Sequence, residues 1–534
     1  MPTKTIDGSF SYTNKTFGGQ VARIPEIRDL ICEFYEEDVF SALGCLLCVN
    51  RDFFFSAIRL LWETINGSNL VVLLPGVSTE YPYQHLSGIT KSNTPDLLPG
   101  DYFDRFSLYA PYVRNLELGL TADYHYKDPQ SLILIRSYAR THVLLPNLIS
   151  LSTRDLQFTW GPWVDPLVDW LEVLLSPSVQ RLDLSPTKKL ARPAAANKLY
   201  VPLMTSFNLC SKLTELSFCY DHSSVPTGLY AVTPINLTSI RCYDAPFHPE
   251  FFTWLAGIPN LQRLEFDSPH SLGPSYVASL TDKLPTLAKL RSLTLENCSS
   301  VFATGLCGSP LVRNIFHLDM HFDLEDEWHS ATIISAFFEQ LSKICFRLTS
   351  LVLYCQEPYH SPTLFSPIHN FRLLRTLPLR ELTLEYCDRG TLGEPSVIRE
   401  MLEIWPTLRE LDIMLYEIDL KDLRIILPFC SRLSLLRLYI PVMLPVELSA
   451  EDLTHALSSQ SGTAYPVLKL FSFGQDDPKW DHSHSALDRI SRYILSLRPN
   501  VSFWISNDYV KPWTTEPYEW ADYLNARLSI PLNI

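Results

Sequence analysis

The chain has 534 residues and a net charge of -14, from 44 basic and 58 acidic side chains. This length exceeds that of a single globular core, so the chain forms several domains or an elongated repeat array. The acidic balance argues against a general affinity for nucleic-acid phosphates and favours basic partners.

Residues 1–20 are expected to form a flexible N-terminus. They lack the apolar core of a secretory signal, and no later run reaches the roughly 18 apolar residues of a membrane-spanning helix. We therefore expect a cytoplasmic and/or nuclear protein. The 12 cysteines are spread along the chain, mostly in apolar segments, which favours reduced, buried thiols over disulfides.

Residues 21–65 are predicted to form a short all-α bundle. Pro25 can occupy the first turn of a helix, and apolar residues follow it at helical spacing. Asp38 is suited to cap a second helix, and a third helix carries Phe53 through Trp62. A bundle of about 40 to 60 residues is too small to be stable without help, so we expect another polypeptide to cover its surplus apolar surface.

Residues 66–110 are predicted to form a linker and entry cap, residues 111–506 a repeat domain, and residues 507–534 a C-terminal cap or tail. Leucine fills about one position in six, and it recurs in the pattern L-x-x-L-x-L. A proline often stands two residues before a copy, where it marks the corner between a helix and a strand. Copies begin at residues 113, 148, 179, 213, 237, 261, 290, 315, 348, 379, 408, 433, 468 and 501.

Helical spacing between these strands is clearest at residues 165–175, 332–344 and 395–405. A strand and helix that repeat in this way cannot bury their apolar faces alone and must stack on neighbouring repeats. We therefore predict an α/β fold in which parallel strands line the concave side of a solenoid and helices cover the convex side. An ordinary α/β domain does not explain the regular spacing, and a parallel β-helix would need more than 19 glycines.

The repeat region resembles the leucine-rich-repeat family in its irregular, long-repeat form. Residues 21–65 resemble an F-box, and the two together resemble fungal, basidiomycete-like F-box proteins with C-terminal leucine-rich repeats. Asn50 and Phe53 depart from the usual Cys and Trp of that motif. The resemblance implies that a Skp adaptor, and through it a cullin, is bound by Ile24, Pro25, Ile27, Ile31, Val49, Arg51, Phe53, Leu61 and Trp62.

Outward-facing strand positions offer a second candidate surface, since residues between the apolar positions point away from the core. Carboxylates and tyrosines gather there, which suits a basic protein target. The predicted target-binding residues on this concave face are Glu265, Asp267, Glu296, Asp319, Tyr243, Tyr354 and Tyr439.

The sequence offers little for chemistry. Cys45 and Cys48 have zinc or redox spacing but no second ligand pair, and His482 and His484 are more typical of a solvated loop. We therefore predict no catalytic residues, metal or cofactor. The resemblance implies a substrate receptor of a Skp-cullin-F-box ubiquitin ligase; the alternatives are a leucine-rich-repeat scaffold or inhibitor without ubiquitin transfer and, third, a hydrolase.

Overall fold

The structure is a computed structural model, and it divides into two compact units, residues 1–237 and 238–534. It describes residues 24–34, 46–67, 70, 103–118, 135–153, 164–184, 202–219, 232–243, 248–267, 274–281, 283–323, 331–356, 368–385, 395–413, 426–439, 467–471 and 503–505.

The first unit joins a pair of N-terminal helices to a parallel sheet. The strands β1 to β5 pair in chain order, each parallel to the next. In chain order, the elements are α2 (Pro25–Phe34), α4 (Arg51–Glu63), β1 (Thr64–Asn66), α6 (Asp104–Tyr109), η1 (Ala110–Tyr112), β2 (Asn115–Glu117), β3 (Ser150–Ser152), α8 (Val164–Leu174), β4 (Arg181–Leu184) and β5 (Glu215–Cys219).

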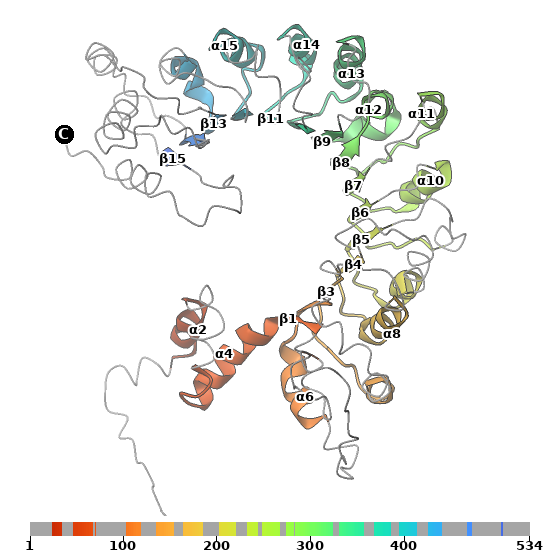
Figure 1. Cartoon of the computed structure of the whole chain (residues 1–534), viewed down its shortest axis with the longest axis vertical. Coiled ribbons are helices and arrows are strands. Elements are labelled where there is room, and N and C mark those ends of the chain that lie inside the picture. Colours follow the sequence, from red (N-terminus) through yellow and green to blue (C-terminus); the bar gives the residue numbers. More distant parts are fainter. Residues whose placement is uncertain are drawn as a thin grey trace, which may run out of the picture. The chain divides into compact units, whose positions relative to one another are not determined.

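The second unit continues the same pattern with ten parallel strands, β6 to β15, again paired in chain order. Its elements are β6 (Ser239–Tyr243), α10 (Pro249–Gly257), β7 (Arg263–Asp267), α11 (Pro274–Thr281), β8 (Ser292–Cys298), α12 (Ser300–Cys307), η5 (Pro310–Asn314), β9 (His317–Asp323), α13 (Ala331–Ile344), β10 (Ser350–Gln356), α14 (Ile368–Leu373), η6 (Leu374–Thr376), β11 (Glu381–Glu385), α15 (Pro395–Ile404), β12 (Glu410–Ile413), η8 (Leu427–Arg432), β13 (Leu435–Tyr439), β14 (Val467–Phe471) and β15 (Phe503–Ile505). Within this unit, helices α10 to α15 follow one side of the row of strands (Figure 1).

A ladder of leucines holds the second sheet in register. Each strand places its second residue beside the second residue of the next, and all of these side chains are at most 1% exposed. The ladder consists of Leu264, Leu293, Leu318, Leu351, Leu382, Leu411 and Leu436. One strand cannot bury such a side chain by itself, so every repeat depends on its neighbours for stability.

The predicted repeat fold is confirmed. Strands β2 to β15 lie at the 14 predicted copies, and the predicted helices correspond to α8, α13 and α15. Of the eight cysteines whose side chains the structure describes, seven are buried free thiols, and burial raises the pKa of Cys345 to about 12. In the described part of the chain, the helices are too short or too polar to span a membrane.

The sheet begins earlier than predicted. The predicted boundary between the helical bundle and the linker, between residues 65 and 66, falls inside strand β1. Strand β1 follows α4 without a linker, and its Ile65 pairs with Leu116 of β2. Ile65 is the one apolar residue of this three-residue strand. It is 4% exposed, so it belongs to the core of the sheet.

Candidate protein-docking surfaces

The helix pair α2–α4 has a small core of its own. Cys32 from α2 and Phe53 and Ala57 from α4 are buried together, and Ile31, Leu46, Leu47, Leu60 and Leu61 pack against them. An ion pair between Arg28 Nη1 and Asp52 Oδ2, 3.1 Å apart, also joins the two helices. Phe53, Ile31 and Leu61, which the sequence assigned to adaptor binding, therefore contribute first to packing within the pair.

Asn50 fixes the start of α4. Its side-chain oxygen accepts hydrogen bonds from the backbone N–H groups of Asp52 and Phe53, each at 2.9 Å. These donors have no partner within the helix, so the asparagine acts as an N-cap. Asn50 is one of the two departures from the F-box pattern, and it has a structural role here as the N-cap of α4.

Large apolar side chains remain exposed on these two helices and just before them, since Ile24 precedes α2 and Val49 precedes α4. The exposed fractions are 46% for Ile24, 59% for Leu30, 58% for Val49 and 41% for Phe55. The other predicted adaptor-binding residues divide into two groups, with Pro25 and Arg51 exposed and Ile27 and Trp62 half-buried. Leu30 and Phe55 are exposed apolar residues of the helix pair that the predicted adaptor-binding set did not include.

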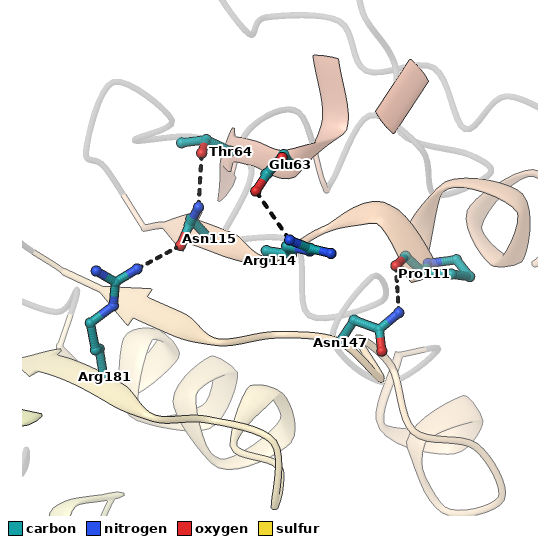
Figure 2. A network of polar contacts seen from close by, with 7 residues as sticks. All are labelled: Glu63, Thr64, Pro111, Arg114, Asn115, Asn147 and Arg181. Atoms are coloured by element: carbon teal, nitrogen blue, oxygen red, sulfur yellow. Dashed lines mark hydrogen bonds and ion pairs between the residues drawn. The ribbon is translucent and has the colours of Figure 1, made fainter. Parts of the chain in front are cut away.

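The helix pair is attached firmly to the first sheet. Trp62, at the end of α4, stacks on Tyr109 with ring centroids 4.6 Å apart. Figure 2 shows the polar contacts that continue this attachment: Arg114 Nη1 lies 3.6 Å from Glu63 Oε1, and Asn115 Nδ2 donates to Thr64 Oγ1 at 3.0 Å. A partner bound to α2 and α4 would therefore have a fixed orientation relative to strands β1 and β2.

Arg181 and Asn147 extend these contacts to later repeats of the same unit. Arg181 Nη2 donates to Asn115 Oδ1 at 3.1 Å, and Asn147 Nδ2 donates to the backbone carbonyl of Pro111 at 2.7 Å (Figure 2). Side chains from β1, β2, β4 and the turn before β3 are thus linked across successive repeats. These contacts hold β2, which receives the contacts of Glu63 and Thr64, against the repeats that follow it.

The predicted target-binding face lies on strands β6 to β10 of the second unit. The register places Arg241, Glu265, Thr294 and Asp319 at equivalent positions of four successive strands, as the sequence predicted. Glu265 and Asp319 are partly exposed, with 20% and 22% of their side-chain surface accessible. The strand spacing of about 4.8 Å brings their charges close together.

This face mixes acids with bases. Arg241 Nε lies 2.5 Å from Glu265 Oε1, and His321 Nε2 lies 3.2 Å from Asp319 Oδ1. Burial raises the pKa of Glu296, and the nearby carboxylates of Glu265 and Asp267 raise it further. The acidic character predicted from the sequence is therefore offset in part by the ion pair with Arg241.

A bulge in β8 moves part of this surface out of line. The pairing of β8 with β9 shifts between Leu295 and Cys298, and Asn297 adopts a positive φ of 50° within the shift. Asparagine tolerates this left-handed conformation better than most residues. Its Nδ2 donates to Asp267 Oδ1 at 2.8 Å, so Asp267, which is 8% exposed, is occupied in holding the bulge.

The predicted tyrosines differ in their surroundings. Tyr354 stacks on His321 with ring centroids 4.9 Å apart, and Tyr243 is half-buried on β6. The side chain of Tyr439 lies outside the described residues, although its backbone ends β13. Sequence reasoning also missed the ion pair between Arg437 Nη1 and the buried Asp412 Oδ2, 2.8 Å apart, farther along the same face.

Of the remaining candidates for chemistry, only Cys48 lies among the described residues. Cys48 is exposed, whereas Cys45, His482 and His484 lie outside the described residues. Among the residues that the structure describes, no three His, Cys, Asp or Glu side chains are grouped as a metal site would require.

The exposed apolar side chains of the helix pair and the polar outward face of the strands are thus two candidate docking surfaces on a solenoid-like α/β repeat fold. No protein-family model matches the sequence. No curated protein matches it either. In the solved structures, a chain from the crystal structure of the yeast Rad7 and Elc1 complex is similar over 75% of this chain and 91% of its own length, with 16% identity and a TM-score of 0.37. A similarity of this size does not assign a family or a function.

Proposed function

We propose that this chain is the substrate-recognition subunit of a Skp-cullin-F-box ubiquitin ligase. In this proposal the helix pair α2–α4 docks a Skp adaptor, and the outward face of the repeat strands holds a protein target. The chain itself is not catalytic. It acts by proximity, raising the effective concentration of target lysines near a ubiquitin-charged enzyme.

Two observations together carry the proposal. Apolar side chains are exposed on and just before α2 and α4, and the end of α4 is attached to the strands of the first unit. Leu30 and Val49 are each more than half exposed, so covering them would remove apolar surface from water. The contacts of Trp62, Glu63 and Thr64 with the first sheet support a fixed geometry between adaptor and repeats. A ligase scaffold needs such a geometry because the target must stay within reach of the transferring enzyme.

The target is proposed to be basic. Glu265 and Asp319 provide partly exposed carboxylates, and Tyr354 provides a large side chain with a polar tip beside them. The ion pair with Arg241 lowers the net charge of this face, so we expect recognition to depend on individual contacts as well as on long-range attraction.

One observation favours the second candidate function, a scaffold that binds a protein without ubiquitin transfer. Helix α4 continues directly into β1, and Trp62 packs on Tyr109, as expected of a cap that protects the first strand. Both roles can coexist, but only the ligase subunit needs the exposed residues of α2 and α4 for binding.

A pulldown of a purified Skp adaptor by the full chain separates the two. The Leu30→Asp and Val49→Asp double variant should lose the adaptor, while Leu209→Asp, which changes a leucine with 44% exposure elsewhere in the first unit, should retain it. No capture by the wild type, or equal capture by both variants, would favour the scaffold.

A further inference from the structure

A row of cations marks the edge at which the chain enters the strands of the second unit. Before each strand from β8 to β13, the residue two positions ahead of the strand is apolar and at most 4% exposed. These residues are Leu290, Ile315, Leu348, Leu379, Leu408 and Leu433. The residues one and three positions ahead of each strand lie on either side of these buried residues and are exposed or half-buried, so they are here called outward positions.

These outward positions carry Lys289, Arg291, Arg347, Arg380, Arg409 and Arg432, here called the basic ridge. All six side chains are exposed, and the outward positions before β8 to β13 contain no Asp or Glu. Within the described part of the chain, no member of the ridge forms an ion pair. Positive charge is therefore concentrated on one edge of an otherwise acidic chain.

The fold does not require arginine at these positions. The repeats β4 and β7 have Gln180 and Gln262 there instead. The carbonyl of Gln262 accepts from the N–H groups of the next strand at 2.8 and 3.0 Å, and the carbonyl of Arg380 does the same at 2.7 and 2.9 Å. The backbone thus links the repeats at this position whether the side chain is Gln or Arg.

Contacts between repeats keep the ridge ordered. Arg409 Nη1 donates to the carbonyl of Arg432 at 3.2 Å, and Arg432 Nη1 donates to the carbonyl of Pro406 at 3.4 Å. The guanidinium carbon of Arg291 lies 5.2 Å from the ring centroid of Phe316, which is 36% exposed. Arg347 is similarly placed 5.7 Å from Phe346, which is 49% exposed, so apolar rings stand beside the cations.

We propose that the basic ridge, with Phe316 and Phe346, docks an extended acidic polypeptide that also carries apolar side chains. Six strands at about 4.8 Å spacing span about 24 Å, which is about seven residues of extended chain. The rings would contact apolar side chains between the acidic ones. This surface is separate from the strand face that is proposed to hold a basic target.

The width of the ridge favours a polypeptide over nucleic acid. Exposed Glu381 and Glu410 are the first residues of β11 and β12, so carboxylates border the row of cations closely. A single extended peptide can follow such a narrow row with its acidic side chains on one side. A nucleic acid carries a charge at every phosphate and is wider than the row, so more of its charges would lie against these carboxylates.

Fluorescence anisotropy with the full chain tests the proposal. The probes are a labelled Glu-rich peptide of about 12 residues with two Phe, the same peptide with Lys in place of Glu, a thymidine oligonucleotide and a DNA duplex. The triple variant Arg291→Gln, Arg380→Gln and Arg409→Gln places the residue of β4 and β7 at three ridge positions. The matched control changes Lys343, Arg372 and Arg399, which are exposed cations on α13, α14 and α15, to Gln.

We expect the acidic peptide to bind, the Lys peptide not to bind, and the ridge triple variant to weaken binding about tenfold or more while the control changes it less than about threefold. Higher salt should weaken binding by the wild type. Phe346→Ser should weaken the Phe-containing peptide more than a peptide of Glu alone. Equal binding by the two triple variants would overturn the proposal, and so would tighter, ridge-dependent binding of either DNA, which would assign the ridge to nucleic acid.

Discussion

Truncation of Leu411 to Ala tests whether the leucine ladder is the source of stability in the second unit. Leu411 is fully buried in β12 and lies beside Leu382 of β11 and Leu436 of β13, both also fully buried. The change removes three carbon atoms, which is about 2.4 kcal/mol at about 0.8 kcal/mol per buried group. The cavity left between two rigid neighbours adds to this, so we expect a loss of about 2 to 5 kcal/mol in the free energy of unfolding.

The loss should be measured by urea denaturation of the full chain, together with hydrogen exchange of the amides in β11 to β13. Leu373→Ala is the control, because this leucine on α14 is 36% exposed and should cost less than about 1 kcal/mol. Adaptor binding should not change, since α2 and α4 belong to the first unit. A loss below about 0.5 kcal/mol, or lost adaptor binding at unchanged stability, would refute the assignment of fold and docking to different parts of the chain.

Three further predictions concern single features of the two surfaces. Asn50→Ala should destabilise the helix pair by about 0.5 to 2 kcal/mol, whereas Asn50→Asp should keep the cap; circular dichroism of both variants during urea unfolding decides this. The pKa of Glu296 is raised above the ordinary value of 4.5, so the folded chain binds more protons than the unfolded chain and this residue lowers stability as the pH rises from 4.5 through the raised pKa. The urea midpoint of Glu296→Gln should therefore exceed that of the wild type by an amount that grows with pH in this window, and parallel profiles would contradict the shift. Reversing Glu265 and Glu296 to Lys should weaken capture of a basic target by about several-fold to a hundredfold, mainly through slower association in stopped-flow measurements, and unchanged capture at low salt would leave these acids as solvated surface.

The strands were predictable because their apolar positions obey one rule in every repeat. A leucine that must meet its equivalents on both sides appears at the same place in the motif, as at Leu382 and Leu411. Strand β1 was not predicted, because it has three residues and a single apolar side chain, Ile65. Only its pairing with β2 identifies it as a strand. Short edge elements depend on tertiary contacts that the local pattern does not contain.

The candidate surfaces were predictable in outline and not in charge state. Alternation along the strands correctly placed Glu265 and Asp319 on one face, but it could not show that Arg241 and His321 pair with them. The bulge at Asn297, which buries Asp267, arises from a left-handed backbone conformation that the repeat pattern hides. The exposed Leu30 required knowledge of which side of α2 meets α4.

Hydrogen–deuterium exchange of the full chain with and without a purified Skp adaptor tests the central claim most directly. Docking on the helix pair should slow exchange in residues 25–34 and 51–63, where α2 and α4 lie, and leave β8 to β13 unchanged. Absence of protection in both helices at saturating adaptor, or protection confined to the repeat strands, would contradict the proposed ligase subunit.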